Sequence, residues 1–119
     1  MREIKFRAIL KGEHIFRKIW GIDFLELRVL VSISGSYEWR KWKVLSEYTG
    51  LKDKNGNGVF EGDIVRFTDG DIGEIFWDAR DLCWSARTPD GYIYALEEDI
   101  ECEIIGNIYE NADLLEGEK

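Results

Sequence analysis

A short run of oxygen-bearing side chains, DKNGNG at Asp53–Gly58, could bind a calcium ion. Aspartate and asparagine at alternate positions that end on a glycine begin the calcium loop of an EF-hand. That loop also needs a bidentate glutamate at its last position, and the residue there is Ile64. We therefore favour the alternative, in which Asn55-Gly56 forms the tight turn of a β-hairpin, because both residues tolerate a positive φ angle.

Other side chains that could carry acid–base or metal chemistry are scattered along the chain. The single histidine, His14, has no cysteine near it in the sequence and no second histidine, so it suggests neither a zinc site nor a nucleophilic triad. Carboxylates gather at 69–71 and 97–101 and could converge on a divalent cation, although such acidic turns are usually solvated loops. The sequence predicts no catalytic residue, no metal site and no cofactor.

A third stretch, YEWRKWK at Tyr37–Lys43, interleaves aromatic with basic side chains. Such a mixture can hold single-stranded nucleic acid, and the same residue types form the hot spots of protein interfaces. Alternatively, the tryptophans fill the core. In an extended strand Trp39 and Trp42 point to opposite faces, so at most one of them is expected to be exposed. The candidate binding residues are Trp39, Arg40, Lys41, Trp42 and Lys43.

The charge of the chain is unevenly distributed. Its 119 residues carry a net charge of −8, but residues 1–60 hold 12 lysines and arginines against 7 acidic residues, whereas residues 61–119 hold 4 against 17. Phosphate backbones repel an acidic surface, so only the N-terminal half could present a basic face to nucleic acid. The opposite charges of the halves favour association with partner proteins, or between copies as a homo-oligomer.

Composition indicates a folded protein of the cytoplasm. Hydrophobic residues make up 45% of the chain, yet no segment has the continuous apolar length of a membrane span. The first ten residues scatter charges where a signal peptide would be apolar. The two cysteines, Cys83 and Cys102, are too few for a secreted disulfide framework. We expect a protein that does not bind membranes and that stays in the cytoplasm.

Alternation of apolar and polar residues is the dominant pattern. It predicts two long strands, Ile4–Leu10 and Leu25–Ile33, and a shorter strand within 14–20 that pairs with one of them. Beyond Gly62 the chain indicates five short strands separated by turn residues. These are 63–68, 73–78, 82–87, 92–96 and 103–109.

Helix is expected in two places only, for about one turn each, near Lys43–Glu47 and around Glu97–Ile100. Many short antiparallel strands favour closure into a barrel, which removes exposed sheet edges. We predict an all-β fold with little helix. It consists of a β-rich N-terminal segment, residues 1–52, and a small SH3-like barrel, residues 53–119, packed as one compact unit.

Three groups of residues carry a family resemblance. They are MREIKFRA at 1–8, YTGLKDKNG at 48–56 with FEGDIV at 60–65, and IGNIYEN at 105–111. In this order they resemble the YopX family, small proteins encoded by bacteriophages and prophages. The chain departs from the family pattern at Ile9 in place of an aromatic residue, at Gly58, which lengthens the central turn, and at Ala112 in place of a proline. The resemblance implies an all-β fold with a barrel-like C-terminal part, and a function that is uncharacterised.

These observations lead to one principal hypothesis and two others. The principal one is a non-enzymatic protein-interaction or regulatory module of phage or prophage type, which can self-associate. The second is a nucleic-acid-binding accessory factor that uses Arg40, Lys41, Lys43 and an exposed tryptophan. The third is a metal-dependent enzyme built on converging carboxylates. The first leads because nothing nucleophilic or metal-binding accompanies the family motifs.

Overall fold

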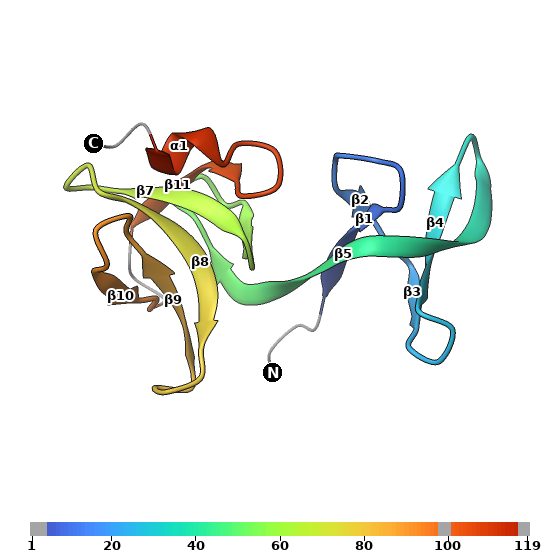
Figure 1. Ribbon diagram of the computed structural model, residues 1–119, viewed down its shortest axis with the longest axis horizontal. Helices are drawn as coiled ribbons and strands as arrows, with labels where there is room; N and C mark the ends of the chain where they lie inside the picture. Colours follow the sequence, from blue (N-terminus) through green and yellow to red (C-terminus); the bar gives the residue numbers. More distant parts are fainter. Residues whose placement is uncertain (1–4, 98–100, 117–119) are drawn as a thin grey trace. The chain divides into compact units, whose positions relative to one another are not determined.

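The computed structural model describes residues 5–97 and 101–116, and its regular structure is almost entirely β-strand (Figure 1). In chain order the elements are β1 (Phe6–Leu10), β2 (Arg17–Lys18), β3 (Gly21–Asp23), β4 (Arg28–Ile33), β5 (Ser36–Lys52), β6 (Gly58–Phe60), β7 (Asp63–Phe67), β8 (Ile72–Asp78), β9 (Cys83–Arg87), β10 (Ile93–Ala95), β11 (Cys102–Asn107) and α1 (Asp113–Glu116). The predicted all-β fold with little helix is confirmed.

The described residues form two compact units that divide after Glu47. The division falls within β5, so that Ser36–Glu47 belongs to the N-terminal unit and Tyr48–Lys52 to the C-terminal unit. The sequence predicts one compact unit with a boundary after Lys52, where this strand ends. At 17 residues β5 is long for a globular protein, and each unit uses its own part of the strand.

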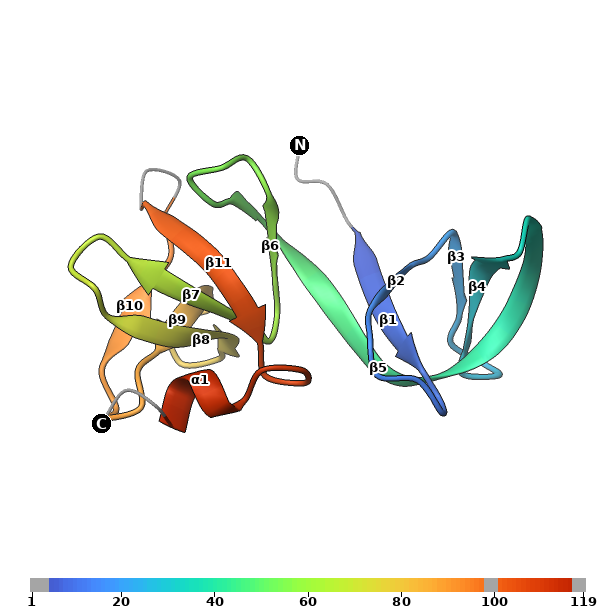
Figure 2. The same cartoon turned by 90° about the horizontal axis from the view of Figure 1, so that it is seen from above.

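The N-terminal unit is an antiparallel sheet with the strand order β2-β1-β5-β4-β3. Figure 2 shows β1 lying alongside β5, and the predicted strand within 14–20 is present as the two-residue β2, paired with β1. One face of the sheet forms the core, because alternate apolar side chains of β1 and β4 point to the same side. The core consists of Ala8, Leu10, Val29 and Val31, covered by Ile19, Ile22, Ile33, Trp42 and Leu45.

The strand expected over Leu25–Ile33 begins three residues later than predicted, at Arg28. The carboxylate of Asp23 accepts hydrogen bonds from the N–H groups of Leu25 and Glu26, at 3.0 and 3.1 Å, and closes a turn between β3 and β4. Such side-chain bonds compete with the strand ladder for the backbone. The apolar residues of this turn continue the alternating pattern of the strand without belonging to it.

The C-terminal unit contains an antiparallel sheet with the order β10-β9-β8-β7-β11, together with the hairpin formed by β6 and the end of β5. All five strands expected beyond Gly62 are present, with ends shifted by at most two residues. The buried cluster comprises Val59, Val65, Ile75, Trp84, Ala86 and Cys102. The SH3-like character of residues 53–119 stays a prediction.

The expectation of a helical turn at Lys43–Glu47 is wrong. These residues lie in β5, where Val44 and Leu45 pair with β1. Ladder hydrogen bonds and the packing of Leu45 on the core outweigh a weak local preference for helix. Of the other expected helical turn, residues 98–100 lie outside the described residues. The short helix α1 was not predicted, and no helix among residues 5–97 and 101–116 has the length and apolar character to cross a membrane.

Candidate functional site

The candidate calcium loop forms the turn between β5 and β6. Asp53 is only 6% exposed, and its Oδ1 accepts hydrogen bonds from the N–H groups of Asn55 and Asn57, at 3.0 and 2.9 Å. Its Oδ2 accepts the N–H group of Ile104 in β11, at 3.1 Å. Gly56 has a φ angle of +84°, as a tight turn requires. The hairpin-turn interpretation is confirmed, with a positive φ angle at Gly56 but not at Asn55.

Both oxygen atoms of the Asp53 carboxylate therefore accept hydrogen bonds from backbone N–H groups. Burial raises the pKa of Asp53, but the hydrogen bonds from the N–H groups of Ile104, Asn57 and Asn55 outweigh burial and hold the pKa below its ordinary value. Ile64, at the position where a calcium loop needs its glutamate, is fully buried. Asp53 thus serves as a charged cross-link between the β5–β6 hairpin and β11.

The other candidate groups, the carboxylates at 69–71 and the single histidine, do not form a common site. Asp69 accepts the N–H group of Asp71, and Asp71 accepts the hydroxyl of Tyr94 at 2.6 Å, which raises the pKa of Tyr94 to about 12. His14 is exposed. Across the part of the chain that the structure describes, which omits residues 98–100 of the second acidic stretch, no three His, Cys, Asp or Glu side chains gather in a metal-holding group.

The closing family motif, IGNIYEN, builds the chain reversal after β11. The Oδ1 of Asn107 accepts the N–H groups of Tyr109 and Glu110, and its Nδ2 donates to the Glu110 carboxylate at 2.7 Å. Asn111 accepts the N–H group of Asn107 and packs so closely on Gly106 that a Cβ there would lie 2.6 Å from the Asn111 Oδ1. These contacts give the motif a structural role, because its polar side chains bond to the local chain.

The aromatic and basic stretch predicted as a binding site lies in β5, within the N-terminal unit. Directly opposed residues of an antiparallel ladder share a face. The outward pairs with β4 are Tyr37 with Ser32, Trp39 with Leu30, and Lys41 with Arg28. Arg40 and Trp42 point to the opposite face, which carries the core. The structure therefore divides the five candidate residues between two faces.

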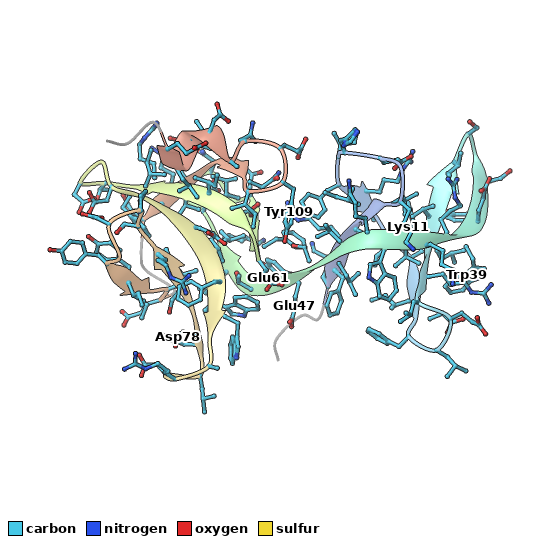
Figure 3. The ribbon with its side chains drawn as sticks, viewed as in Figure 1. Lys11, Trp39, Glu47, Glu61, Asp78 and Tyr109 are labelled. Atoms are coloured by element: carbon cyan, nitrogen blue, oxygen red, sulfur yellow. The ribbon has the colours of Figure 1, made fainter. Side chains whose placement is uncertain are left out.

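Trp39 is the exposed tryptophan of the pair. It is 43% exposed and extends from β5 toward β3, where its ring lies 3.4 Å from the position that a Cβ on Gly21 would occupy (Figure 3). Trp42 packs against the core cluster and meets the ring of Phe24 edge to face, with centroids 6.3 Å apart. Only Trp39 is therefore available to a partner in the way that the binding hypotheses require.

The three basic candidates all have partners within the chain. The Nζ of Lys41 donates to the carbonyl oxygen of Glu26 at 2.6 Å, and the Nζ of Lys43 donates to that of Glu13 at 2.9 Å. Arg40 lies 3.5 Å from the Glu38 carboxylate. These side chains brace loops of the N-terminal unit, so only part of their hydrogen-bonding capacity faces solvent.

Two further aromatic side chains lie beside Trp39 on the outer face. Trp20 and Tyr37 are exposed and meet edge to face at 5.3 Å. Cations lie over two of the rings at 5.2 Å, Lys18 over Trp20 and Arg28 over Trp39. We call Trp20, Tyr37 and Trp39 the aromatic face. The sequence pattern does not indicate Trp20, because only the strand order β5-β4-β3 brings it next to Tyr37.

Comparison with known proteins adds the family. The sequence profile described as YopX protein matches residues 5–116. The chain belongs to the YopX family. Its fold is similar to that in the crystal structure of protein EF1440 from Enterococcus faecalis, with a TM-score of 0.59 and 23% identity, covering 97% of this chain and 99% of that one. No curated protein matches this YopX chain. At this level of identity the likeness to EF1440 shows the fold alone.

Proposed function

We propose that this YopX protein is a non-enzymatic protein-interaction module and that the aromatic face of its N-terminal unit binds the partner. One observation carries the proposal: three large aromatic side chains are exposed side by side, while the basic side chains of the same stretch are engaged within the chain. The proposal extends to a protein of phage or prophage type that acts inside a bacterial cell. The partner is a host or phage protein, or a second copy of the chain.

The aromatic face has the composition of an interface hot spot. Tryptophan and tyrosine are enriched in hot spots because they bury a large area with few rotatable bonds. In this unit the rings are also held in place, since Trp20 contacts Tyr37 and Trp39 packs over Gly21. Side chains that are already ordered lose less entropy when a partner binds. Exposed rings that the free protein keeps ordered therefore support a binding role.

The same contacts weigh against the alternative of a nucleic-acid-binding factor. Phosphate neutralisation needs lysine and arginine side chains that are free to reach the backbone of the nucleic acid. Lys41 and Lys43 instead donate to carbonyl oxygens, and Arg28 is paired with Asp23 at 3.1 Å. Glu38 adds a carboxylate next to Arg40. A protein surface is therefore the better partner for this face.

Charge also permits self-association. Residues 5–47 contain 9 lysines and arginines against 5 acidic residues, while residues 48–119 contain 6 against 18. The N-terminal unit of one copy and the C-terminal unit of another would attract each other at low ionic strength. If charge is the main cause of such an oligomer, raising the salt concentration dissociates it.

Affinity capture with matched tryptophan variants tests the proposal. The tagged protein and its Trp39→Ala and Trp77→Ala variants are incubated with bacterial lysate, with and without nuclease. Trp77 of the C-terminal unit is a matched control, because its 42% exposure equals that of Trp39 within one per cent. We expect the wild type and Trp77→Ala to retain the same nuclease-resistant protein and Trp39→Ala to lose it, since truncating a hot-spot tryptophan weakens binding by about 30-fold or more.

Two results would contradict the proposal. Loss of the captured material on nuclease treatment would identify a nucleic acid as the primary ligand. Equal capture by all three proteins would show that the aromatic face is not the binding surface. Thermal melting of each variant before the assay verifies that it is folded.

A further inference from the structure

The strands β8, β9 and β10 lie side by side in the C-terminal unit, and their outer face holds a cavity of about 400 Å³ (Figure 1). Ile75, Trp84 and Ala86 point into the core, so the residues that alternate with them point away from it. Phe76 and Ser85 are two of these residues, and both line the cavity. Its volume is within the size range of small-molecule sites.

The register of the ladder orders the lining of this cavity. Ala95 is opposite Ser85, which is opposite Phe76, so these three side chains form a floor that crosses the three strands. Arg87 and Ile93, the opposed pair two residues along, bound the floor at one end. Ser85 is buried on the floor, whereas Ile93 is half exposed. The end of β8 and the turn that follows it bound the floor at the other end.

Both ends of the cavity carry charged groups that the chain does not neutralise. The guanidinium of Arg87 leans over the floor, 4.1 Å from the centroid of the Phe76 ring. Asp78, at the end of β8, is only 7% exposed, and its Oδ1 accepts the N–H group of Arg80 at 3.0 Å (Figure 3). Within the part of the chain that the structure describes, its Oδ2 and the side chains of Arg80, Asp81 and Arg87 make no ion pair or hydrogen bond.

The backbone explains why these opposite charges stay apart. The guanidinium of Arg87 is placed over Phe76, and Phe76 and Asp78 are two residues apart on β8, which corresponds to about 7 Å along an extended strand. An ion pair needs a separation of about 4 Å or less. Glu74 is directly opposite Arg87 on β8 and makes no ion pair with it either. The cavity therefore presents positive and negative groups at separate positions.

The mixed charge of the lining selects the ligand. Asp78 and Asp81 would repel a phosphate group, and the two arginines would repel a metal ion. A wholly apolar molecule would cover charged groups without compensating them. A molecule with one carboxylate and one ammonium group can pair with both kinds of group. Phe76, Ile93 and Ala95 would then contact an apolar side chain of that molecule.

We infer that this cavity binds a small zwitterion with an apolar side chain, of the amino-acid and dipeptide class. The carboxylate of the ligand pairs with Arg87, and its ammonium group pairs with the Oδ2 of Asp78. Arg80 and Asp81, the exposed charged members of the lining, add a second group of each sign. The hydroxyl of Ser85 can bond to either end of the ligand. The inference does not depend on the aromatic face, which lies in the other unit.

Titration of the full-length protein, followed by nuclear magnetic resonance of its backbone amides, tests the inference. The probes are leucine and leucyl-leucine. Their matched controls are N-acetyl-leucine, which lacks the ammonium group, and leucinamide, which lacks the carboxylate. We expect a zwitterion to shift the amide signals of β8–β10 with a Kd of about 1 mM or lower, and each blocked compound to bind about tenfold more weakly or worse. The tighter of the two zwitterions distinguishes an amino-acid site from a dipeptide site.

Two variants with matched controls locate the charged contacts. Arg87→Gln should raise the Kd of the tighter zwitterion about tenfold or more and leave that of leucinamide unchanged, since leucinamide has no carboxylate. Arg66→Gln, at an exposed arginine of the same unit outside the cavity, should leave the zwitterion Kd within about twofold. Asp78→Asn should also weaken binding. Its control is Asp69→Asn, because Asp69 likewise accepts the N–H group two residues on, from Asp71 at 3.0 Å.

Each outcome decides the inference, separately from the proposed function. Absence of a saturable shift from both zwitterions, equal affinity for the blocked compounds, or shifts confined to the N-terminal unit would overturn it. So would an Arg87→Gln Kd within about twofold of the wild type in a variant whose melting curve verifies that it is folded. Capture of a protein partner through Trp39 tests the other unit, so either result there leaves the decision on this cavity to the titration.

Discussion

Replacing Asp53 by asparagine should destabilise the C-terminal unit, because the carboxylate accepts the backbone N–H groups of Asn55 and Asn57 in the β5–β6 turn and of Ile104 in β11. The substitution keeps the size of the side chain, and its one remaining carbonyl oxygen can still accept from Asn55 and Asn57. Its amide nitrogen, however, would face the N–H group of Ile104, where Oδ2 now accepts a hydrogen bond at 3.1 Å. Two donors would then oppose each other at a site that is nearly buried.

The expected magnitude follows from that geometry. A hydrogen bond to a charged acceptor contributes about 1.5–3 kcal/mol, and a buried donor left without a partner costs about 1–3 kcal/mol. Both quantities describe the loss of the same hydrogen bond, so they do not add in full. We expect the free energy of unfolding to fall by about 2–4 kcal/mol. Asp69→Asn is the control, because Asp69 is exposed and accepts a single N–H group, from Asp71. That variant should change stability by less than about 0.5 kcal/mol.

Urea denaturation followed by tryptophan fluorescence measures the global effect, since Trp77 and Trp84 lie in the same unit as Asp53. Amide hydrogen exchange measures the local one: the Ile104 amide should exchange faster in Asp53→Asn. An unfolding free energy within about 0.5 kcal/mol of the wild type, with unchanged exchange at Ile104, would refute the structural account of this carboxylate. So would calcium-dependent stabilisation of the wild type that Asp53→Asn abolishes.

The pH dependence of stability has a defined sign at the same residue. The pKa of Asp53 is lower in the folded protein than its ordinary value of about 3.9. The carboxylate therefore stabilises the fold fully above that ordinary value, and the contribution is lost as the pH falls through the lower pKa of the folded state. The difference in stability between the wild type and Asp53→Asn should accordingly shrink in acid, below about pH 4.

Three further predictions follow from burial and packing. Trp42→Ala should cost about 2–4 kcal/mol of stability and Trp39→Ala less than about 1 kcal/mol, measured by urea denaturation, because only Trp42 packs on the core. Gly106→Ala should cost about 2–3 kcal/mol and lower the melting temperature, because its Cβ would lie 2.6 Å from a side-chain oxygen that caps the turn. A thiol reagent should modify Cys83 before Cys102. Burial is the main cause that raises the pKa of the Cys102 thiol, and nearby acidic groups raise it further. Faster labelling of Cys102, located by mass spectrometry, would contradict this order.

Alternation and turn chemistry predicted most of the fold, because both are local. The strands of the C-terminal unit follow directly from apolar positions between turn residues. The Leu25–Leu27 segment shows the limit of that reasoning: its apolar residues keep the alternating pattern, but hydrogen bonds to Asp23 place them in a turn, and β4 begins only at Arg28. The helical turn expected at Lys43–Glu47 failed for a related reason, since pairing with β1 is a long-range interaction.

The candidate site was predictable in part. Alternation alone places Trp39 and Trp42 on opposite faces, but which face is the core depends on the strands that pack there. The order β5-β4-β3 adds Trp20 to the outer face, and no local pattern in the sequence indicates that neighbour. Composition therefore indicated the strand that carries two of the three residues of the aromatic face, Tyr37 and Trp39, and sheet topology adds the third, Trp20.

The partners of the basic residues were the decisive missing information. The ammonium groups of Lys41 and Lys43 each have three hydrogen-bond donors, and a carbonyl oxygen of the chain accepts one of them. The carbonyl oxygens that they use belong to Glu26 and Glu13, 15 and 30 residues away in sequence. The basic side chains of this stretch suggest phosphate binding in the sequence. In the folded unit Lys41 and Lys43 instead hold loops in place through these hydrogen bonds, and aromatic side chains are exposed beside them. That change of role is the physical reason to seek a protein partner first.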